Sequence, residues 1–203
     1  YYGANTSFCT QTNNNINDKD NALRQIINFV KPDIFSVNEI STKQEYHQRI
    51  LDSILNINQK ALFKKANVTN YSSSIIGNGF FYNSDKFYLY KEYALLGGTR
   101  DFNIYTLYYK TPELSWSNDT VFINCIVVHL KAGSTETDIA SRDDEAKVIM
   151  EHLNAVNRKG NYFLMGDFNV YKSNEAPFQR FVNHSNTNIR FYDPLQQLGK
   201  WSQ

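Results

Sequence analysis

Residues 162–170 of the 203-residue chain read YFLMGDFNV, an apolar run that ends abruptly in a carboxylate. The apolar part is typical of a buried strand. Asp167 closes it, and the amide of Asn169 follows two residues later. If Phe168 is extended, Asp167 and Asn169 lie on one side of the strand end, because side chains alternate along a strand. We expect a rigid strand terminus to hold both groups for chemistry.

Apolar residues at helical spacing lie upstream of this strand. The pattern predicts a helix over residues 138–157, which Gly160 ends. It also predicts a first helix that begins with Asp18 or Asp20 as its cap and stops at Pro32. The apolar stripes comprise Leu23, Ile26, Ile27 and Val30 in the first helix, and Ala146, Ile149, Met150, Leu153 and Val156 in the later one.

A strand and a second helix follow the first helix. Residues 34–40 are short and apolar enough to form the strand. Ser41 or Thr42 then begins a helix, with Gln44 or Glu45 three residues on, as in a capping box. The stripe of this helix comprises Ile50, Leu51, Ile54 and Leu55.

The middle of the chain is rich in strands and has no helical pattern. The segment GFFYNSDKFYLY predicts a hairpin that turns at Asn83–Lys86. Strands over residues 103–110 and 120–130 follow, separated by a polar turn at Ser117–Asp119. This long stretch without helices favours a four-layer α-β-β-α sandwich, with two mixed and mostly antiparallel sheets, over a doubly wound parallel sheet.

The composition is that of a globular protein rich in aromatic residues. Hydrophobic residues make up 41% of the chain, and its 14 Tyr and 14 Phe favour sheet. The net charge is +1, so no general polybasic attraction to nucleic acid or membrane is available. Local residues or a metal must therefore handle any phosphate. Nothing marks a break, and we expect one domain over residues 1–203.

Several protein classes are disfavoured by motifs that the sequence lacks. Cys9 and Cys125 match no zinc spacing, and both a disulfide and two separate thiols stay open. No apolar run is long enough to span a bilayer. The sequence has neither a Gly-rich phosphate loop of the P-loop type nor the Gly-x-Ser-x-Gly elbow of a serine hydrolase.

Four polar residues stand where apolar strands end: Glu39, His129, Asp167 and Asn169. Taken alone, each of these residues could have a purely structural role. Glu39 could face solvent, and Asp167 could cap a turn. His129 could be a hydrogen-bonded core histidine, and Asn169 could tolerate an unusual backbone angle. Together, two carboxylates, an imidazole and an amide at strand ends are the groups that a hard metal and a phosphate require.

The segments SVNEI, VVHLKAG and GDFN occur in this order along the chain. The set resembles the endonuclease/exonuclease/phosphatase superfamily, the metal-dependent phosphoesterases that include pancreatic deoxyribonuclease. Between these segments, YNSDKF and GGTRDFN resemble the central hairpin of that family and its substrate-side arginine segment.

The resemblance implies roles for five residues. Glu39 would bind a catalytic Mg²⁺, or Mn²⁺ or Ca²⁺ in its place. Asp167 would orient or deprotonate the attacking water, and Asn169 would position the phosphate. His129 would stabilise charge on a phosphate oxygen. Arg100 would touch the substrate phosphate, or is simply a solvated loop charge.

Two features of the family have no counterpart here. The first strand of the family, which carries a metal-binding Asn, would precede Tyr1, and the chain stops before the final Ser-Asp-His signature. None of the four histidines follows Ser-Asp. We expect a domain that is incomplete at both ends rather than a degenerate member of the family. An intact protein that had lost these strands would have exposed sheet edges, which proteins avoid because such edges promote aggregation.

Three functions follow as hypotheses. The first is an endonuclease-like, metal-dependent phosphodiesterase that hydrolyses nucleic acid by attack of water. The second applies the same chemistry to a phospholipid, sphingomyelin or an inositol phosphate, with Tyr1, Tyr2 and Phe8 as candidate lipid contacts. The third is a non-catalytic binding module. Composition resembles exported bacterial members of the family, so a secreted or cell-surface location is expected, and the cytoplasm stays open.

Overall fold

The computed structural model describes residues 1–10, 12–57, 62–115 and 120–201. In chain order, the elements are α1 (Ile16–Val30), β1 (Ile34–Ser41), α2 (Gln44–Ile50), the π-helical turn η1 (Leu51–Leu55), β2 (Phe63–Lys65), β3 (Ile76–Asn83), β4 (Phe87–Leu96), β5 (Asp101–Tyr109), the 3₁₀ turn η2 (Pro112–Ser115), β6 (Phe122–His129), α3 (Glu136–Val156), β7 (Asn161–Asp167) and α4 (Ala176–Val182).

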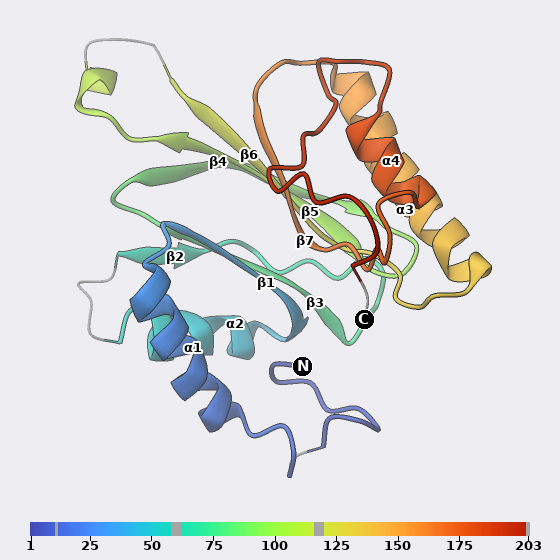
Figure 1. The fold of residues 1–203 in the computed structure, drawn as a ribbon. Coiled ribbons are helices and arrows are strands. Elements are labelled where there is room, and N and C mark those ends of the chain that lie inside the picture. Colours follow the sequence, from blue (N-terminus) through green and yellow to red (C-terminus); the bar gives the residue numbers. More distant parts are fainter. Residues whose placement is uncertain (11, 58–61, 116–119, 202–203) are drawn as a thin grey trace.

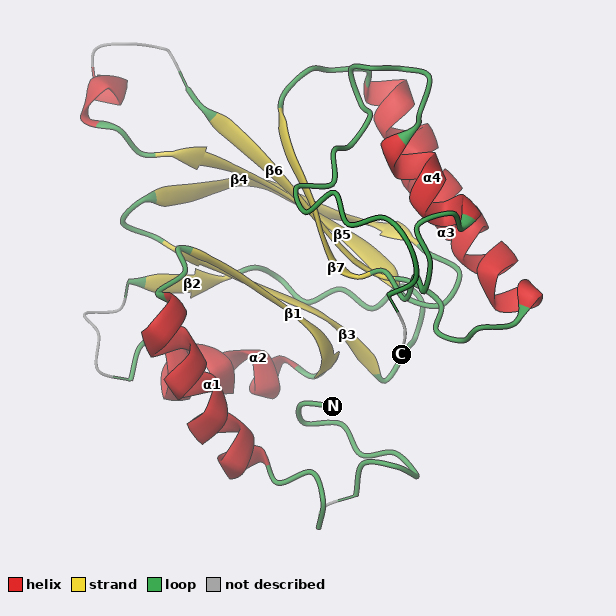
Figure 2. Ribbon diagram, in the orientation of Figure 1, coloured by secondary structure: helices red, strands yellow, loops and turns green. Residues whose placement is uncertain are grey.

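These elements form the predicted four layers (Figure 1). One sheet has the strand order β1-β3-β2 and is antiparallel, and the other has the order β4-β5-β6-β7, in which only β6 and β7 run parallel. Helices α1 and α2 cover the outer face of the first sheet, and α3 and α4 cover the outer face of the second (Figure 2). Within the described residues, no helix is both long and apolar enough to cross a membrane.

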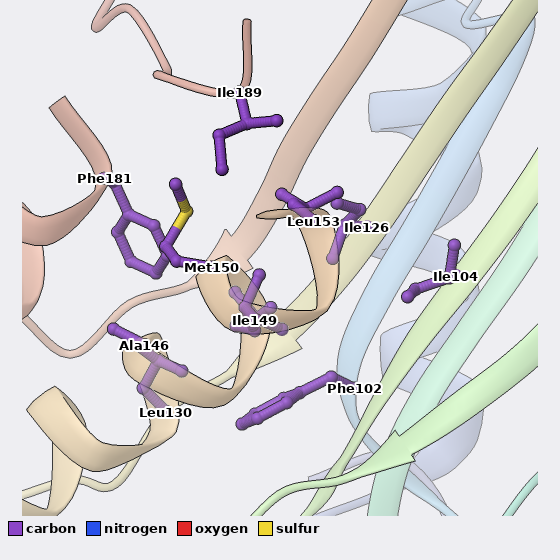
Figure 3. Packing of buried hydrophobic residues seen from close by; sticks show 11 residues of the cluster. Phe102, Ile104, Ile126, Leu130, Ala146, Ile149, Met150, Leu153, Phe181 and Ile189 are labelled. Carbon is purple, nitrogen blue, oxygen red and sulfur yellow. The ribbon is translucent and has the colours of Figure 1, made fainter. Parts of the chain in front are cut away.

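Three apolar clusters fill the spaces between the layers. The first lies between the four-stranded sheet and helices α3 and α4 (Figure 3). The second lies between the sheets and includes Phe80 stacked on Tyr105, with ring centroids 4.1 Å apart, and the buried free thiol of Cys125. The third joins the three-stranded sheet to α1, α2 and η1. Cys9 is also a free thiol, so the two cysteines do not pair.

The predicted hairpin at Asn83–Lys86 is wrong. Strand β3 pairs with β1 and β2, whereas β4 pairs with β5, so this turn carries the chain from one sheet to the other. The Asn83 side chain accepts the Asp85 N–H at 3.0 Å within the turn. A short turn between apolar runs looks the same in sequence whether the strands pair or separate. The predicted polar turn at Ser117–Asp119 lies outside the described residues.

Strand β7 is not the buried strand that its apolar sequence predicts. It is the last strand of its sheet, and Phe163 is 53% exposed. Three predicted stripe residues are also exposed: Ile26, Val30 and Val156. Hydrophobicity predicts these elements correctly, but it cannot tell which neighbours cover them.

Helix starts differ from the predictions because other residues supply the caps. Asn15 caps α1 by accepting the Asn17 N–H, whereas Asp20 is buried and forms an ion pair with Arg49 at 2.6 Å. Helix α2 begins after Lys43 without a side-chain cap, because Ser41 still belongs to β1. Helix α3 begins two residues earlier than predicted, with a capping box between Thr135 and Asp138.

Candidate active site

Strand β1 brings Glu39 to the site through a β-bulge. Val37 pairs with Gly79 and Ile40 pairs with Gly77, so Asn38 and Glu39 together oppose the single residue Asn78. Glu39 has a φ of 59°, a left-handed angle that is uncommon for a residue with a side chain. Bulges re-aim side chains, and backbone strain of this kind clusters at functional sites.

The Glu39 carboxylate is half-buried and, among the residues described, has no hydrogen-bond or ion-pair partner. Its neighbour Asn38 ties the bulge to the opposite sheet, because the Asn38 amide donates to the Val128 carbonyl at 3.0 Å. The Ser36 hydroxyl likewise contacts the Met165 sulfur at 3.4 Å. The end of β1 therefore lies over the ends of β6 and β7, but no described contact joins Glu39 directly to the other predicted site residues.

Strands β6 and β7 place His129 and Asp167 side by side. The two residues are partners in the parallel ladder, and His129 Nε2 lies 3.8 Å from Asp167 Oδ2. His129 alternates with Cys125 and Val127, which pack between the sheets, so its ring faces the other sheet. The His129 side chain is 2% exposed and the Asp167 side chain is 51% exposed. The pair therefore has one buried member and one that solvent reaches.

Gly166 allows this close pairing. Its φ is +128°, and a Cβ at this position would lie 2.0 Å from the Val128 carbonyl oxygen. No residue with a side chain fits there without moving the backbone of β6.

Asn169 is near Asp167 but does not share a strand face with it. Strand β7 ends at Asp167, Phe168 lies beyond it, and Asn169 has a left-handed φ of 49°. Asp167 Oδ1 accepts the Asn169 backbone N–H at 2.9 Å, and the Asn169 amide donates to the Leu130 carbonyl at 2.9 Å. Strand β7 therefore does not continue through Phe168 to Asn169. A turn brings the two groups together instead.

His129 and Arg100 present buried nitrogen atoms that have no partner. Within the described part of the chain, Nε and Nη1 of Arg100 and Nδ1 of His129 are buried without a hydrogen bond, as is Nε of Arg142 on α3. Burial and, to a lesser extent, the Arg100 charge lower the pKa of His129 to about 4, while Asp167 acts in the opposite direction. His129 is therefore neutral at neutral pH. Unpaired buried polar atoms are costly and rare, and the two Arg100 N–H donors require an acceptor such as an anion.

An amide network that the sequence did not reveal lies behind these residues. The Asn38 amide donates to Asn78 Oδ1 at 2.7 Å, and the Asn78 amide donates to Asn103 Oδ1 at 2.9 Å. The Asn103 amide then donates to the Thr69 hydroxyl at 2.7 Å. The network crosses between the sheets at the end where the bulge lies, so it fixes the position of β1 over β6.

A groove of about 970 Å³ borders the same strand end on the outer side. Asp167 and Asn169 line it together with many aromatic side chains, which include Phe168, Tyr171, Phe181, Phe191, Tyr192 and Trp201. Glu39 and His129 are not among the lining residues.

The residues fit a metal only in a limited way. Among the residues described, no group of three or more His, Cys, Asp and Glu side chains is arranged to hold a metal ion. Mg²⁺, however, is often held by one or two carboxylates, with waters and substrate phosphates as its other ligands. The unpartnered Glu39 carboxylate meets that lesser requirement.

The architecture is the fold of the endonuclease/exonuclease/phosphatase superfamily. The structure of the human Nocturnin catalytic domain with bound sulfate is similar, with a TM-score of 0.58 and 16% identity over 84% of this chain and 63% of that chain. ANGEL2, a 2′,3′-cyclic phosphatase, in complex with adenosine-2′,3′-vanadate, has a TM-score of 0.56 and 12% identity over 89% of this chain and 54% of that chain.

D. rerio TDP2 complexed with a single-strand DNA product is also similar, with a TM-score of 0.51 and 12% identity over 78% of this chain and 56% of that chain. The chain thus spans less than two thirds of the length of these structures. At such identities the likeness is one of fold. No protein-family model matches the sequence, and the search of curated proteins gave no match.

Proposed function

We propose that this protein is a metal-dependent phosphodiesterase that hydrolyses nucleic acid. The observation that carries the proposal is the set of unpartnered buried nitrogens on Arg100 and His129, together with the exposed carboxylate of Asp167, which lies 3.8 Å from His129 Nε2. A phosphate oxygen satisfies such donors, and an adjacent carboxylate can accept a proton from water. Three structures that share the fold have a sulfate, a vanadate-linked nucleoside or a DNA product bound.

Each residue has a defined part in this proposal. Arg100 binds the phosphate through its free Nε–H and Nη1–H groups. Asp167 orients the attacking water and takes its proton, because solvent reaches this carboxylate. The Asn169 amide, already anchored on Leu130, positions the phosphate beside Asp167. His129 donates a hydrogen bond to the phosphate oxygen on which negative charge develops.

Glu39 is the residue that would hold the metal. A bound Mg²⁺, or Mn²⁺ or Ca²⁺ in its place, would supply positive charge that neutralises the phosphate. Among the described residues this carboxylate has no hydrogen-bond or ion-pair partner, so it is free to bind a cation.

The test is cleavage of plasmid DNA by the complete gene product in the presence of Mg²⁺. Glu39→Gln removes the carboxylate charge while keeping its shape, and we expect a loss of about 100-fold or more. Glu45→Gln, on the exposed face of α2, is the matched control and should cleave normally. Full activity in Glu39→Gln would refute the metal assignment. Phosphate binding without cleavage in the unaltered protein would instead point to a non-catalytic binding module.

A second substrate class has one feature in its favour. The aromatic groove beside Asp167 and Asn169 could receive the acyl chain of a phospholipid. Of the three expected lipid contacts, Phe8 is 83% exposed, but Tyr2 is buried with its hydroxyl on Asp20. Activity on sphingomyelin vesicles that exceeds activity on DNA would favour this class.

A further inference from the structure

Helix α3 buries two charged side chains next to the site. Arg142 is 0% exposed and Glu145 is 3% exposed. They are three residues apart, so they lie on the same face of the helix. A buried charge is costly unless its hydrogen bonds are made, so the partners of these two residues show what they hold.

Glu145 joins the two backbone segments that carry Arg100 and His129. One carboxylate oxygen accepts the Lys131 N–H at 2.7 Å, and the other accepts the Thr99 N–H at 3.3 Å. Lys131 follows His129 by two residues, and Thr99 immediately precedes Arg100. A single side chain therefore bridges the His129 and Arg100 segments at the end of the β5–β6 ladder.

Arg142 joins the same segment to the loop after Asn169. Its Nη1 donates to the carbonyls of Lys131 and Gly133, at 2.9 Å and 2.6 Å. Its Nη2 forms an ion pair with Glu175 at 2.8 Å, and the other Glu175 oxygen accepts the backbone N–H groups of residues 171–172. The peptide of Lys131 is thus held at its N–H by Glu145 and at its carbonyl by Arg142.

We propose that Glu145 is a positioning residue, which aligns Arg100 and His129 so that their free nitrogens meet at one phosphate. This inference rests on the proposed function, because it takes the phosphate of the substrate as the ligand. The burial of this carboxylate is not explained by an ion pair, because it has none among the described residues. It is not explained by apolar packing either, because its neighbour Ala146 belongs to an apolar cluster, where a charge is unfavourable. The two hydrogen bonds that Glu145 accepts from the backbone do explain its burial.

The test compares two substitutions on the same helix. Glu145→Gln leaves one acceptor oxygen, so one of the two backbone segments is released. Glu151→Gln makes the same chemical change at a side chain that is 67% exposed. NMR signals of the Arg100 Nε–H group and the His129 ring report the alignment, and titration with inorganic phosphate reports its consequence.

In Glu145→Gln we expect both sets of signals to move and phosphate to bind roughly tenfold more weakly, the effect of losing one hydrogen bond to a charged group. Glu151→Gln should leave the signals in place and the affinity within about twofold. Thermal unfolding checks that both variants are folded. If Glu145→Gln does not fold, Glu145→Asp, which keeps the charge on a shorter side chain, has the same expected results.

The direction of the affinity change separates positioning from simple electrostatics. Removal of a negative charge near an anion site should strengthen phosphate binding if Glu145 acts only through its charge. Tighter binding, or unmoved Arg100 and His129 signals, would therefore overturn the proposal. If the unaltered protein binds no phosphate, the proposed function loses its support, while the movement of the two signals still decides the role of Glu145.

Discussion

At Gly166 a side chain would meet the backbone of the neighbouring strand. Gly166→Ala would put a methyl group against the Val128 carbonyl, in a backbone conformation that side chains rarely adopt. We expect a loss of unfolding free energy on the order of 3 kcal/mol. Gly199 has a φ of +126° with no atom within 4 Å of an added Cβ, so Gly199→Ala should cost only about 1 kcal/mol. Equal losses in denaturant unfolding would mean that the β6–β7 contact does not matter.

Two buried histidines make the fold sensitive to acid. Burial lowers the pKa of His47 and of His129 to about 4, from an ordinary value of 6.5. The unfolded chain therefore binds more protons than the folded chain below about pH 6.5, and stability falls from there toward pH 4. Each histidine accounts for a loss of about 3 kcal/mol at most. Stability above pH 7 should not change through these groups.

His47→Gln tests this pH dependence away from the site, because a Gln amide can still donate to the Ser41 carbonyl that His47 Nε2 contacts at 2.9 Å. Unfolding free energy measured from pH 7.5 to pH 4.5 should decline less steeply in the variant. Parallel curves for the two proteins would contradict the assignment.

Among the elements, α3 has the most clearly defined start. The Thr135 hydroxyl accepts the Asp138 N–H at 3.2 Å, and Thr135→Ala should cost about 1 kcal/mol of stability. Ser141→Ala removes a half-buried hydroxyl from the second turn of the same helix and should change stability by less than about 0.5 kcal/mol, because Ala favours helices. A smaller loss for Thr135→Ala than for Ser141→Ala would show that the capping box is not formed in solution.

The elements that the sequence predicted best are those with a strong local pattern. The spacing of Ala146, Ile149, Met150 and Leu153 predicted α3, and the apolar run before Asp167 predicted β7. Strand pairing was not predictable from local patterns. The turn at residues 83–86 suggested a hairpin, but it joins strands of different sheets. The bulge at Glu39 also escaped prediction, because it depends on the register of β1 against β3.

For the molecule as a whole, the order of elements was enough to predict the layers, but not the polar contacts between them. Polar residues at strand ends predicted the positions of His129 and Asp167, which are ladder partners. The roles given to these residues stay predictions. The network of Asn38, Asn78 and Asn103 could not be predicted, because each residue comes from a different strand and meets the others only when the two sheets stack.

Because Cys125 is buried between the sheets, the rate at which a reagent modifies its thiol reports how often the two sheets separate. Its thiol is 0% exposed and burial raises its pKa to about 12, so an alkylating reagent attacks it only when the layers part. Iodoacetamide followed by mass spectrometry should modify Cys9 within minutes and Cys125 only at the rate of opening. Asn78→Ala removes a hydrogen bond between the sheets and should speed up the modification of Cys125 alone. Modification of both thiols at the same rate in the unaltered protein would show that the space between the sheets is already open to the reagent.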